Sequence, residues 1–309
     1  MKPIYVPKGK AKEYGDYAIN IYTGCPHECF YCFAPNVLHR EKEKFHSCIA
    51  PRENIVEETK KQIEREGITG KLIHLCFTCD PYPYGYDTTP TREIIKVLKD
   101  SGNNVQILTK GDGSRDFDLL DRRDWYGITL DGTDCKAPLK ERAGALFEAH
   151  RKGIKTWVSF EPVTNEERFF HELQTVAFMV DKVKIGKLNY HPSSIDWKSF
   201  GKKAEALCKS LGLDYYIKDG LRAEMLKEND MARYIDAEIV LKIIDSYAKT
   251  VTTDGKVVVD AIRDIVAVIA PTADVVPKSE VEELQAEVGR LEKENAELLV
   301  SSNQKLLGN

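Results

Sequence analysis

Three closely spaced cysteines are the residues in this sequence with the clearest capacity for chemistry. Cys25, Cys29 and Cys32 form a C-x3-C-x2-C triplet within residues 22–35. Cysteine thiolates are the usual ligands of [4Fe–4S] clusters, and a cluster that only transfers electrons takes four protein ligands. Three thiolates therefore predict a cluster in which one iron stays open to a small molecule.

A structural zinc site is the alternative use of the same thiolates. Such sites have four ligands, commonly arranged as two short pairs. His27, His39 and Cys48 are candidates for a fourth ligand. A further C-x2-C pair, Cys76 and Cys79, lies in a strand-like apolar run rather than in a turn. The spacing favours the cluster.

Length, charge and cysteine content limit the classes of protein to consider. A chain of 309 residues holds one large core or two domains. The net charge is −4, with residues 1–220 nearly balanced and residues 221–309 acidic, so there is no overall basic footprint of a nonspecific nucleic-acid binder. The amino terminus lacks the apolar core of a signal peptide, and we expect a cytoplasmic protein without a membrane span whose eight cysteines stay reduced.

Short β-rich runs alternate with amphipathic stretches between residues 17 and 218. The predicted strands are 17–22, 72–79, 105–109, 125–130, 155–160, 182–186 and 214–218, and the predicted helices are 54–66, 91–100, 116–123, 140–152, 166–179 and 197–210. This alternation predicts parallel strands with right-handed crossovers, in an open or partial (β/α)6-type barrel. In such barrels the chemistry takes place at the carboxyl ends of the strands.

The chain resembles the radical S-adenosylmethionine (radical SAM) superfamily over residues 16–218, and most closely its spore photoproduct lyase-like branch, often labelled DNA repair photolyases. The cysteine triplet, with an aromatic residue before its last cysteine, is the specific part of the resemblance. Further matching segments are Gly24-Cys25, Tyr31-Cys32, Asp80-Pro81, Leu108-Thr-Lys110, Gly127-Ile-Thr129, Ser159-Phe-Glu-Pro162 and Lys184-Ile-Gly-Lys-Leu-Asn189.

The resemblance implies an enzyme with a [4Fe–4S] cluster that cleaves S-adenosylmethionine reductively. The resulting 5′-deoxyadenosyl radical would abstract hydrogen from a substrate, with a nucleic acid or nucleotide as the leading class and a lyase or transferase outcome left open. It also implies an electron donor of the flavodoxin or ferredoxin type. Modification of a peptide or small metabolite is the main alternative, and a zinc-stabilised binding module without enzymatic activity is another.

The resemblance also assigns roles to single residues. The cluster ligands would be Cys25, Cys29 and Cys32, and Tyr31 would lie against adenine. Lys110 would meet the methionine carboxylate, Thr129 the ribose, and Cys79 the methionyl group. Glu161, held before Pro162, is a candidate catalytic residue.

One position departs from the spore photoproduct lyases. They carry a hydrogen-donating cysteine at the end of the second strand, and the equivalent residue here is Phe77. Side chains alternate along a strand, so Cys79 is expected on the same side as Phe77 and Cys76 on the other. Cys79 is therefore the candidate donor, and simple packing of both cysteines is the alternative.

Other polar residues near strand ends are given structural roles. We expect His74 to be a hydrogen-bonded core residue and Asp80 to cap the proline-rich turn that follows it. Lys184 and Lys218 are interpreted as exposed strand ends.

The alternation stops after Gly220, which divides the chain into a barrel (1–220), a helical extension (221–275) and a coiled-coil tail (276–309). Helices are predicted at 233–249 and 257–269. Heptad spacing of apolar residues begins at Val281, and Asn295 occupies a core position. Glutamates that would face one another across a homodimer predict weak self-association, or pairing with a basic partner helix.

Overall fold

The computed structural model describes residues 2–227, 234–236 and 275–277. The chain divides into two compact units, residues 1–226 and 227–309. In the second unit the described residues form one antiparallel pair, β9 (Tyr234–Asp236) with β10 (Val275–Pro277). β9 lies at the start of the stretch predicted as helix 233–249, so that prediction is wrong there. The predicted helix 257–269 and the coiled coil lie outside the described residues.

The first unit is built on an eight-stranded sheet whose strands follow one another in chain order. The strands are β1 (Ile4–Tyr5), β2 (Tyr17–Ile19), β3 (Leu72–Leu75), β4 (Asn104–Thr109), β5 (Trp125–Thr129), β6 (Lys155–Val163), β7 (Lys182–Lys187) and β8 (Tyr215–Ile217). β2 to β8 are parallel, and β1 pairs antiparallel with β2. The sheet stays open, which confirms the predicted partial barrel.

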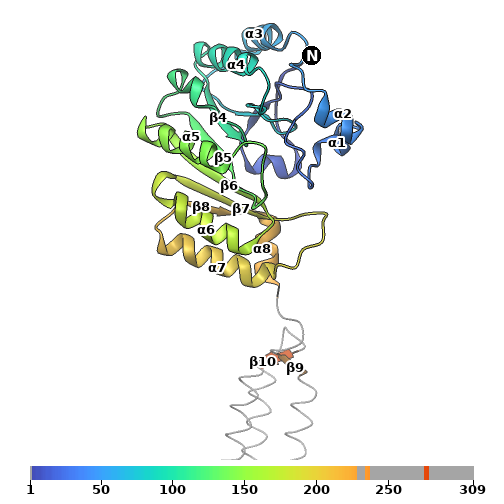
Figure 1. Cartoon of the computed structure of the whole chain (residues 1–309), viewed down its shortest axis with the longest axis vertical. Helices are drawn as coiled ribbons and strands as arrows, with labels where there is room; N and C mark the ends of the chain where they lie inside the picture. The colour runs from blue at the N-terminus through green and yellow to red at the C-terminus, as the bar shows by residue number, and fades with distance from the viewer. Residues whose placement is uncertain (1, 228–233, 237–274, 278–309) are drawn as a thin grey trace, which may run out of the picture. The chain divides into compact units, whose positions relative to one another are not determined.

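Helices connect the parallel strands. They are α1 (Ala34–Val37), α2 (Lys42–Ser47), α3 (Ile55–Glu66), α4 (Thr89–Asp100), α5 (Leu139–Arg151), α6 (Glu166–Val176), α7 (Trp197–Ser210) and α8 (Asp219–Leu226), with 3₁₀ helices η1 (Gly9–Glu13), η2 (Ser114–Leu119) and η3 (Ala177–Met179). Helices α4 to α7 follow one another along one side of the sheet, and α1 and α2 lie on the other (Figure 1). Among the residues described, no helix combines the length and apolar character needed to cross a membrane.

The two faces of the sheet differ in polarity because side chains alternate along each strand. One set of positions is apolar and fully buried in the core beneath the helices, as at Ile73, Ile107 and Val183. The alternate positions are polar or large, as at His74 and Lys184, and they line the inner face. This polar lining marks the inner face as the place for a site.

The strand predicted at 72–79 is shorter in the structure, and the difference moves two cysteines. β3 ends at Leu75, and Cys76 adopts a left-handed backbone with φ 69°. The Asn20 side chain accepts hydrogen bonds from the backbone N–H groups of Phe77 and Thr78, at 2.8 and 3.0 Å, which takes these residues out of the ladder. The expected alternation of Cys76, Phe77 and Cys79 is therefore wrong.

Candidate active site

The cysteine loop leaves β2 and is held against α2. Backbone hydrogen bonds join Cys25 N to Phe45 O (3.2 Å) and Thr23 N to Ala50 O (2.9 Å). Gly24 lies so close to this segment that a Cβ there would be 2.5 Å from the Phe45 carbonyl oxygen. Only glycine fits that approach, so the residue before the first cysteine serves the loop's path.

The three cysteines of this loop are free thiols with partial exposure. Burial raises the pKa of Cys25 and Cys32. Between the first two cysteines, His27 is buried, with Nε2 3.2 Å from Asp80 Oδ2 and Nδ1 without a hydrogen-bond partner among the described residues. The loop therefore presents three sulfur atoms with a buried, partly unpaired imidazole between two of them.

Lys110 connects this loop to the carboxyl end of the sheet. It follows β4, and its buried Nζ lies 3.2 Å from Cys29 Sγ and 2.6 Å from Tyr31 Oη. Nζ also donates to Asp131, which follows β5, and the Tyr31 hydroxyl donates to the same Asp131 oxygen. The structure therefore brings Lys110 against the cysteine loop, beside Cys29 and Tyr31.

The electrostatics of this group follow from its burial and its single carboxylate. Burial opposes the charge on Lys110, but Asp131 and Cys29 outweigh it, so the pKa of Lys110 is raised. Burial likewise opposes ionisation of Asp131, but Lys110 and Tyr31 keep the pKa of Asp131 below its usual value. Burial and the neighbouring Asp131 carboxylate raise the pKa of Tyr31. The group is thus a buried ion pair with a neutral phenol beside it.

Asp131 is a site residue that the sequence analysis missed. Its other carboxylate oxygen accepts hydrogen bonds from the backbone N–H and the hydroxyl of Thr133, at 3.1 and 2.9 Å. In the sequence it precedes Gly132, so it resembles an ordinary turn aspartate. The available signal was its place directly after the strand predicted at 125–130.

Asp80 braces the strand end that carries Lys110. Its carboxylate accepts hydrogen bonds from Lys110 N (2.8 Å), Thr109 Oγ1 (2.5 Å) and Tyr82 N (2.8 Å). The contact with Tyr82 N confirms the predicted cap of the proline-rich turn. Burial raises the pKa of this carboxyl, but His27 and these donors outweigh burial, so the pKa of Asp80 is lowered.

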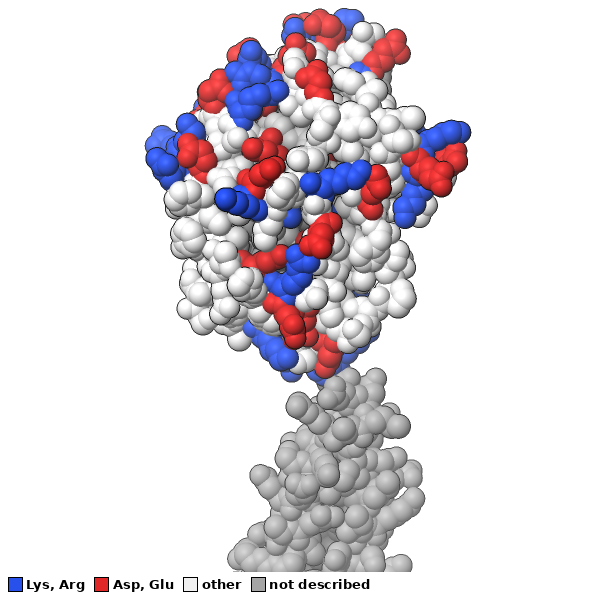
Figure 2. All heavy atoms as spheres, viewed as in Figure 1, with Lys and Arg blue, Asp and Glu red and all other residues white. Residues whose placement is uncertain are grey.

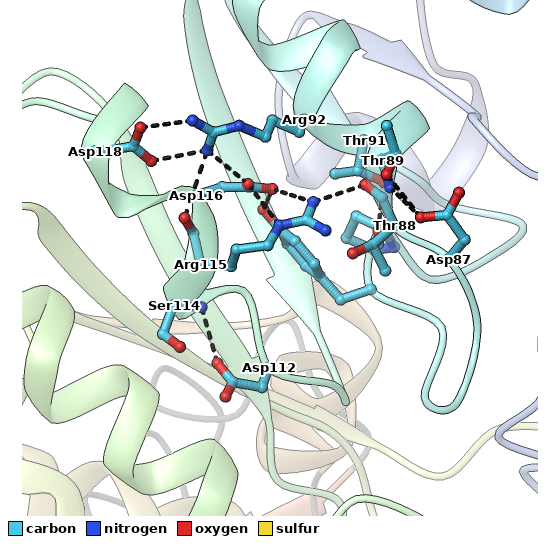
Figure 3. Close-up of polar contacts among 12 residues, drawn as sticks. Asp87, Thr88, Thr89, Thr91, Arg92, Asp112, Ser114, Arg115, Asp116 and Asp118 are labelled. Atoms are coloured by element: carbon cyan, nitrogen blue, oxygen red, sulfur yellow. Dashed lines mark hydrogen bonds and ion pairs between the residues drawn. The ribbon is translucent and has the colours of Figure 1, made fainter.

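A second network holds the same turn from outside, as Figure 3 shows. Asp116 is fully buried and accepts from Arg92 Nη1 (3.0 Å), Arg115 Nε (3.0 Å) and Tyr82 Oη (3.1 Å). Arg92 also makes a two-point contact with Asp118, at 2.8 and 2.6 Å. These contacts tie the start of α4 to η2, and so fix the loop that follows Lys110.

Thr129 and Cys79 are less clearly placed by their contacts. Thr129 is buried at the end of β5, where its carbonyl oxygen accepts from Arg142 Nη1 at 2.5 Å. Cys79 and Cys76 lie close enough for their thiols to hydrogen-bond, and this contact with Cys76 helps lower the pKa of Cys79 against the effect of burial. Burial and this contact raise the pKa of Cys76.

Glu161 belongs to a different group, inside the barrel. Its Oε2 accepts from Lys218 Nζ at 2.5 Å and from the hydroxyl of Tyr14. Lys218 and Lys184 are buried and not the exposed strand ends that the sequence suggested. Lys184 lies within β7 and Lys218 follows β8, and they donate hydrogen bonds to the Glu13 carbonyl oxygen and the Glu161 carboxylate, respectively. Tyr14 was missed, since it precedes the first predicted strand in a segment without a pattern. His74 is buried and hydrogen-bonded to Gln106 (2.9 Å), as expected.

The residues of the cysteine loop fit a cluster by their chemistry. All three donors are free sulfur atoms in one loop, and Lys110 Nζ is within hydrogen-bond distance of one of them. Within the described ranges, no three His, Cys, Asp or Glu side chains gather as they would around a single metal ion. Sulfur-only ligation is typical of iron–sulfur clusters.

Comparison with solved structures identifies the fold. A spore photoproduct lyase mutant matches with a TM-score of 0.54 and 13% identity, over 69% of this chain and 79% of that one. Streptococcus suis SuiB bound to S-adenosylmethionine matches with a TM-score of 0.51 and 9% identity, over 69% of this chain and 53% of that one. The fold is that of the partial radical SAM barrels. This confirms the fold predicted from the sequence.

The sequence comparisons add a relative without a known activity. No family model matches the chain. An uncharacterized protein of Methanocaldococcus jannaschii is 28% identical over 177 residues, which are 53% of this chain. The match spans 64% of that protein's length, less than two thirds.

Proposed function

We propose that the chain is a radical SAM enzyme. The observation that carries the proposal is the approach of Lys110 to Cys29 at 3.2 Å, because it joins a three-thiol loop to a cation at the carboxyl end of a parallel sheet. The partial radical SAM barrel supports it. Chemistry in barrels of parallel strands is built at that end.

Cys25, Cys29 and Cys32 would hold three irons of a [4Fe–4S] cluster. When bound, the cluster would supply the electron that cleaves S-adenosylmethionine into methionine and a 5′-deoxyadenosyl radical. Lys110 would pair with the methionine carboxylate, since a buried ammonium group is a strong partner for it. Tyr31 would contact adenine, Thr129 the ribose and Cys79 the methionyl group.

Asp131 holds Lys110 in place when S-adenosylmethionine is not bound. In the free protein its carboxylate holds Lys110, and it also accepts from Tyr31 and Thr133. When the carboxylate of S-adenosylmethionine takes a share of Lys110, these other donors still stabilise Asp131. We therefore assign Asp131 as a positioning residue for Lys110 and Tyr31.

The substrate, electron donor and compartment extend the proposal. A nucleic acid or nucleotide follows from the resemblance to spore photoproduct lyase. On the face in Figure 2, Lys and Arg alternate with Asp and Glu, so this face offers no basic track for a phosphate backbone. The SuiB neighbour is described bound to a precursor peptide, which supports the peptide alternative. A flavodoxin- or ferredoxin-type donor in the cytoplasm would supply electrons.

Anaerobic reconstitution tests the proposal. We expect about four iron and four sulfide per chain. Dithionite with S-adenosylmethionine should then release 5′-deoxyadenosine, and Cys25→Ala, Cys29→Ala and Cys32→Ala should each abolish its release. Cys48→Ala is the matched control, since this thiol is exposed and outside the triplet. One tightly bound zinc without iron uptake would refute the proposal and favour the zinc module.

A further inference from the structure

The inner face of the barrel holds a charged group that the cofactor proposal does not use. Glu161 of β6, Lys184 of β7 and Lys218 after β8 meet there and are completed by Glu13 and Tyr14, which come from η1 and the residue after it. Gly186 of β7 leaves room for the meeting, because a Cβ there would lie 3.0 Å from Glu161 and 3.1 Å from Lys218. Glu161, Lys184 and Lys218 form the binding groups of this site. Glu13 and Tyr14 of the amino-terminal segment occupy it.

Both the hydroxyl and the ring of Tyr14 are bound by this site. Its hydroxyl donates to Glu161 and lies 3.3 Å from Ser159 Oγ. Its ring centroid lies 5.5 Å from that of His74 and 5.9 Å from that of Trp157, while the Lys184 and Lys218 ammonium groups lie 4.1 and 4.5 Å from it. Aromatic neighbours and two cations near one ring form a strong aromatic binding environment.

Glu13 is bound through its backbone carbonyl oxygen and its carboxylate, as an acidic residue of a peptide would be. Its carbonyl oxygen accepts from Lys184 Nζ at 2.6 Å, and its carboxylate lies 3.2 Å from Lys218 Nζ. Burial and the neighbouring Lys218 lower the pKa of Lys184 to about 8, although Glu161 and Glu13 act in the opposite direction. Lys184, Lys218 and Glu161 thus fit a peptide carbonyl, a carboxylate and a phenol that belong to two consecutive residues.

The segment that fills the site is weakly attached by its backbone. In the described part of the chain, residues 9–16 make no backbone hydrogen bond to the strands, and Tyr14 N bonds only to Ala11 O at 3.1 Å. Gly9 and Gly15 flank the segment, and a short 3₁₀ helix has poor hydrogen-bond geometry. The Glu13 and Tyr14 side chains and the Glu13 carbonyl oxygen therefore make the main contacts of this segment with the barrel.

We propose that this inner face is the substrate site, that it recognises a peptide in which an acidic residue precedes a tyrosine, and that Glu13 and Tyr14 occupy it in the free protein. The inference rests on the proposed function, because it names the substrate class that the barrel presents to the cofactor. A nucleotide is the less favourable occupant, because Glu161 accepts a hydrogen bond from the tyrosine hydroxyl, and a phosphate group has no donor to offer in its place.

Binding of a small probe to the full chain tests the proposal without S-adenosylmethionine chemistry. The probe is N-acetyl-Glu-Tyr-amide, and titration calorimetry gives its affinity. Tyr14→Ala should bind it at least about tenfold more tightly than the wild type, because the tethered segment no longer competes. Tyr86→Ala, an exposed tyrosine on another loop, should behave as the wild type. Adding Lys184→Met to Tyr14→Ala should abolish the gain.

Hydrogen exchange of the wild type keeps the test decisive if Tyr14→Ala fails to fold. Saturating probe should increase exchange of residues 9–16 and leave β3 to β8 unchanged. No change in that segment, or equal affinity in wild type and Tyr14→Ala, would overturn the proposal. Tighter binding of thymidine 5′-monophosphate than of the peptide would also overturn it. Release of 5′-deoxyadenosine without probe binding would refute this inference alone, whereas probe binding without a cluster would refute the proposed function alone.

Discussion

Lys110 is shared by three groups, and this sharing limits how strongly it can bind a further anion. In the free protein its ammonium group contacts the Cys29 sulfur, the Tyr31 hydroxyl and the Asp131 carboxylate. Binding of a substrate carboxylate therefore exchanges one anionic partner for another. The net gain is the difference between two charge-assisted hydrogen bonds, which is smaller than either.

Replacing Lys110 tests its role in binding S-adenosylmethionine. We expect Lys110→Met to raise the Kd of reconstituted protein by about 3- to 10-fold, because exchanging Asp131 for the methionine carboxylate leaves less than the about 1.5–3 kcal/mol of a full hydrogen bond to a charged group. Iron content should stay unchanged. Equilibrium binding measures the Kd. The double variant Lys110→Met with Asp131→Asn is measured as well, because Lys110→Met alone leaves the Asp131 carboxylate without its ammonium partner.

Lys136→Met is the matched control for this prediction. Lys136 also contacts the cysteine loop, through an ion pair with Glu28 at 2.5 Å, but it is exposed. Exposed pairs contribute little, so its Kd should change by less than about twofold. An unchanged Kd for Lys110→Met would show that the strand-end lysine does not meet the carboxylate.

His74 makes the stability of the barrel depend on pH. Burial lowers the pKa of His74 from its usual value to about 4. Between about pH 6.5 and 4, His74 is therefore protonated in the unfolded chain and neutral in the folded chain. Stability should therefore fall as pH drops from 6.5 to 4, by about 3 kcal/mol from this residue. Urea unfolding of cluster-free protein at pH 7.0 and 4.5 measures the loss. Between these two pH values the free energy of unfolding should fall less in His74→Gln than in the wild type, by about that amount. Equal falls in both proteins would contradict the prediction.

Single residues were predictable where type and place in the pattern agreed. The cysteine triplet was found because thiols at close spacing are a local signal, and Lys110 because the resemblance to the radical SAM superfamily assigned it. Tyr14 was missed because its partner Glu161 lies 147 residues along the chain, and Asp131 because its contacts with Lys110 and Tyr31 join different strand ends and the cysteine loop. Only the folded sheet brings such residues together.

At the level of elements, the loop after β4 is fixed by one buried carboxylate and one exposed carboxylate that share Arg92. Asp116 has no exposed side-chain surface, whereas the side chain of Asp118 is 58% exposed. This pair separates the effect of burial from that of charge. Removing one partner of a buried ion pair leaves an uncompensated charge, and removing an exposed partner does not.

Asp116→Ala should lower the free energy of unfolding by about 1–3 kcal/mol, because it leaves the buried Tyr82 hydroxyl without its acceptor. Asp118→Ala should lower it by less than about 1 kcal/mol, because exposed pairs contribute little. Urea unfolding measures both values. Equal losses would mean that the two carboxylates act only through Arg92 and that the burial of Asp116 is unimportant.

The elements themselves were largely predictable from local pattern. The amphipathic stretch that ends at Gly67 forms α3, and Gly67 has the positive φ of a helix C-cap. β1 was missed because two residues carry no periodicity. The strand predicted through Cys79 ends early because a distant side chain, Asn20, captures its backbone N–H groups. Local propensity contains no information about such a contact.

At the level of the whole molecule, the end of the barrel differs between pattern and structure. The strand–helix alternation placed it at Gly220, whereas the first compact unit runs to Leu226 and includes α8. Leu221 of α8 is fully buried, and Met225 lies against Gly201 of α7, where a Cβ would be 2.4 Å from the Met225 Cγ. α8 is thus packed as part of the core of the barrel.

Two truncations distinguish these boundaries. A chain that ends at Lys227 should keep the Tm and the iron uptake of the full protein, because the sheet, the cysteine loop and α8 are all retained. A chain that ends at Gly220 should lose about 2–5 kcal/mol, the usual effect of removing a buried leucine, and its Tm should fall by about 5 °C or more. Thermal unfolding and iron analysis check both. If the longer truncation product also loses stability or iron uptake, residues 228–309 contribute to the fold of the barrel, and the tail is not the separate unit that its acidic, heptad-patterned sequence predicts.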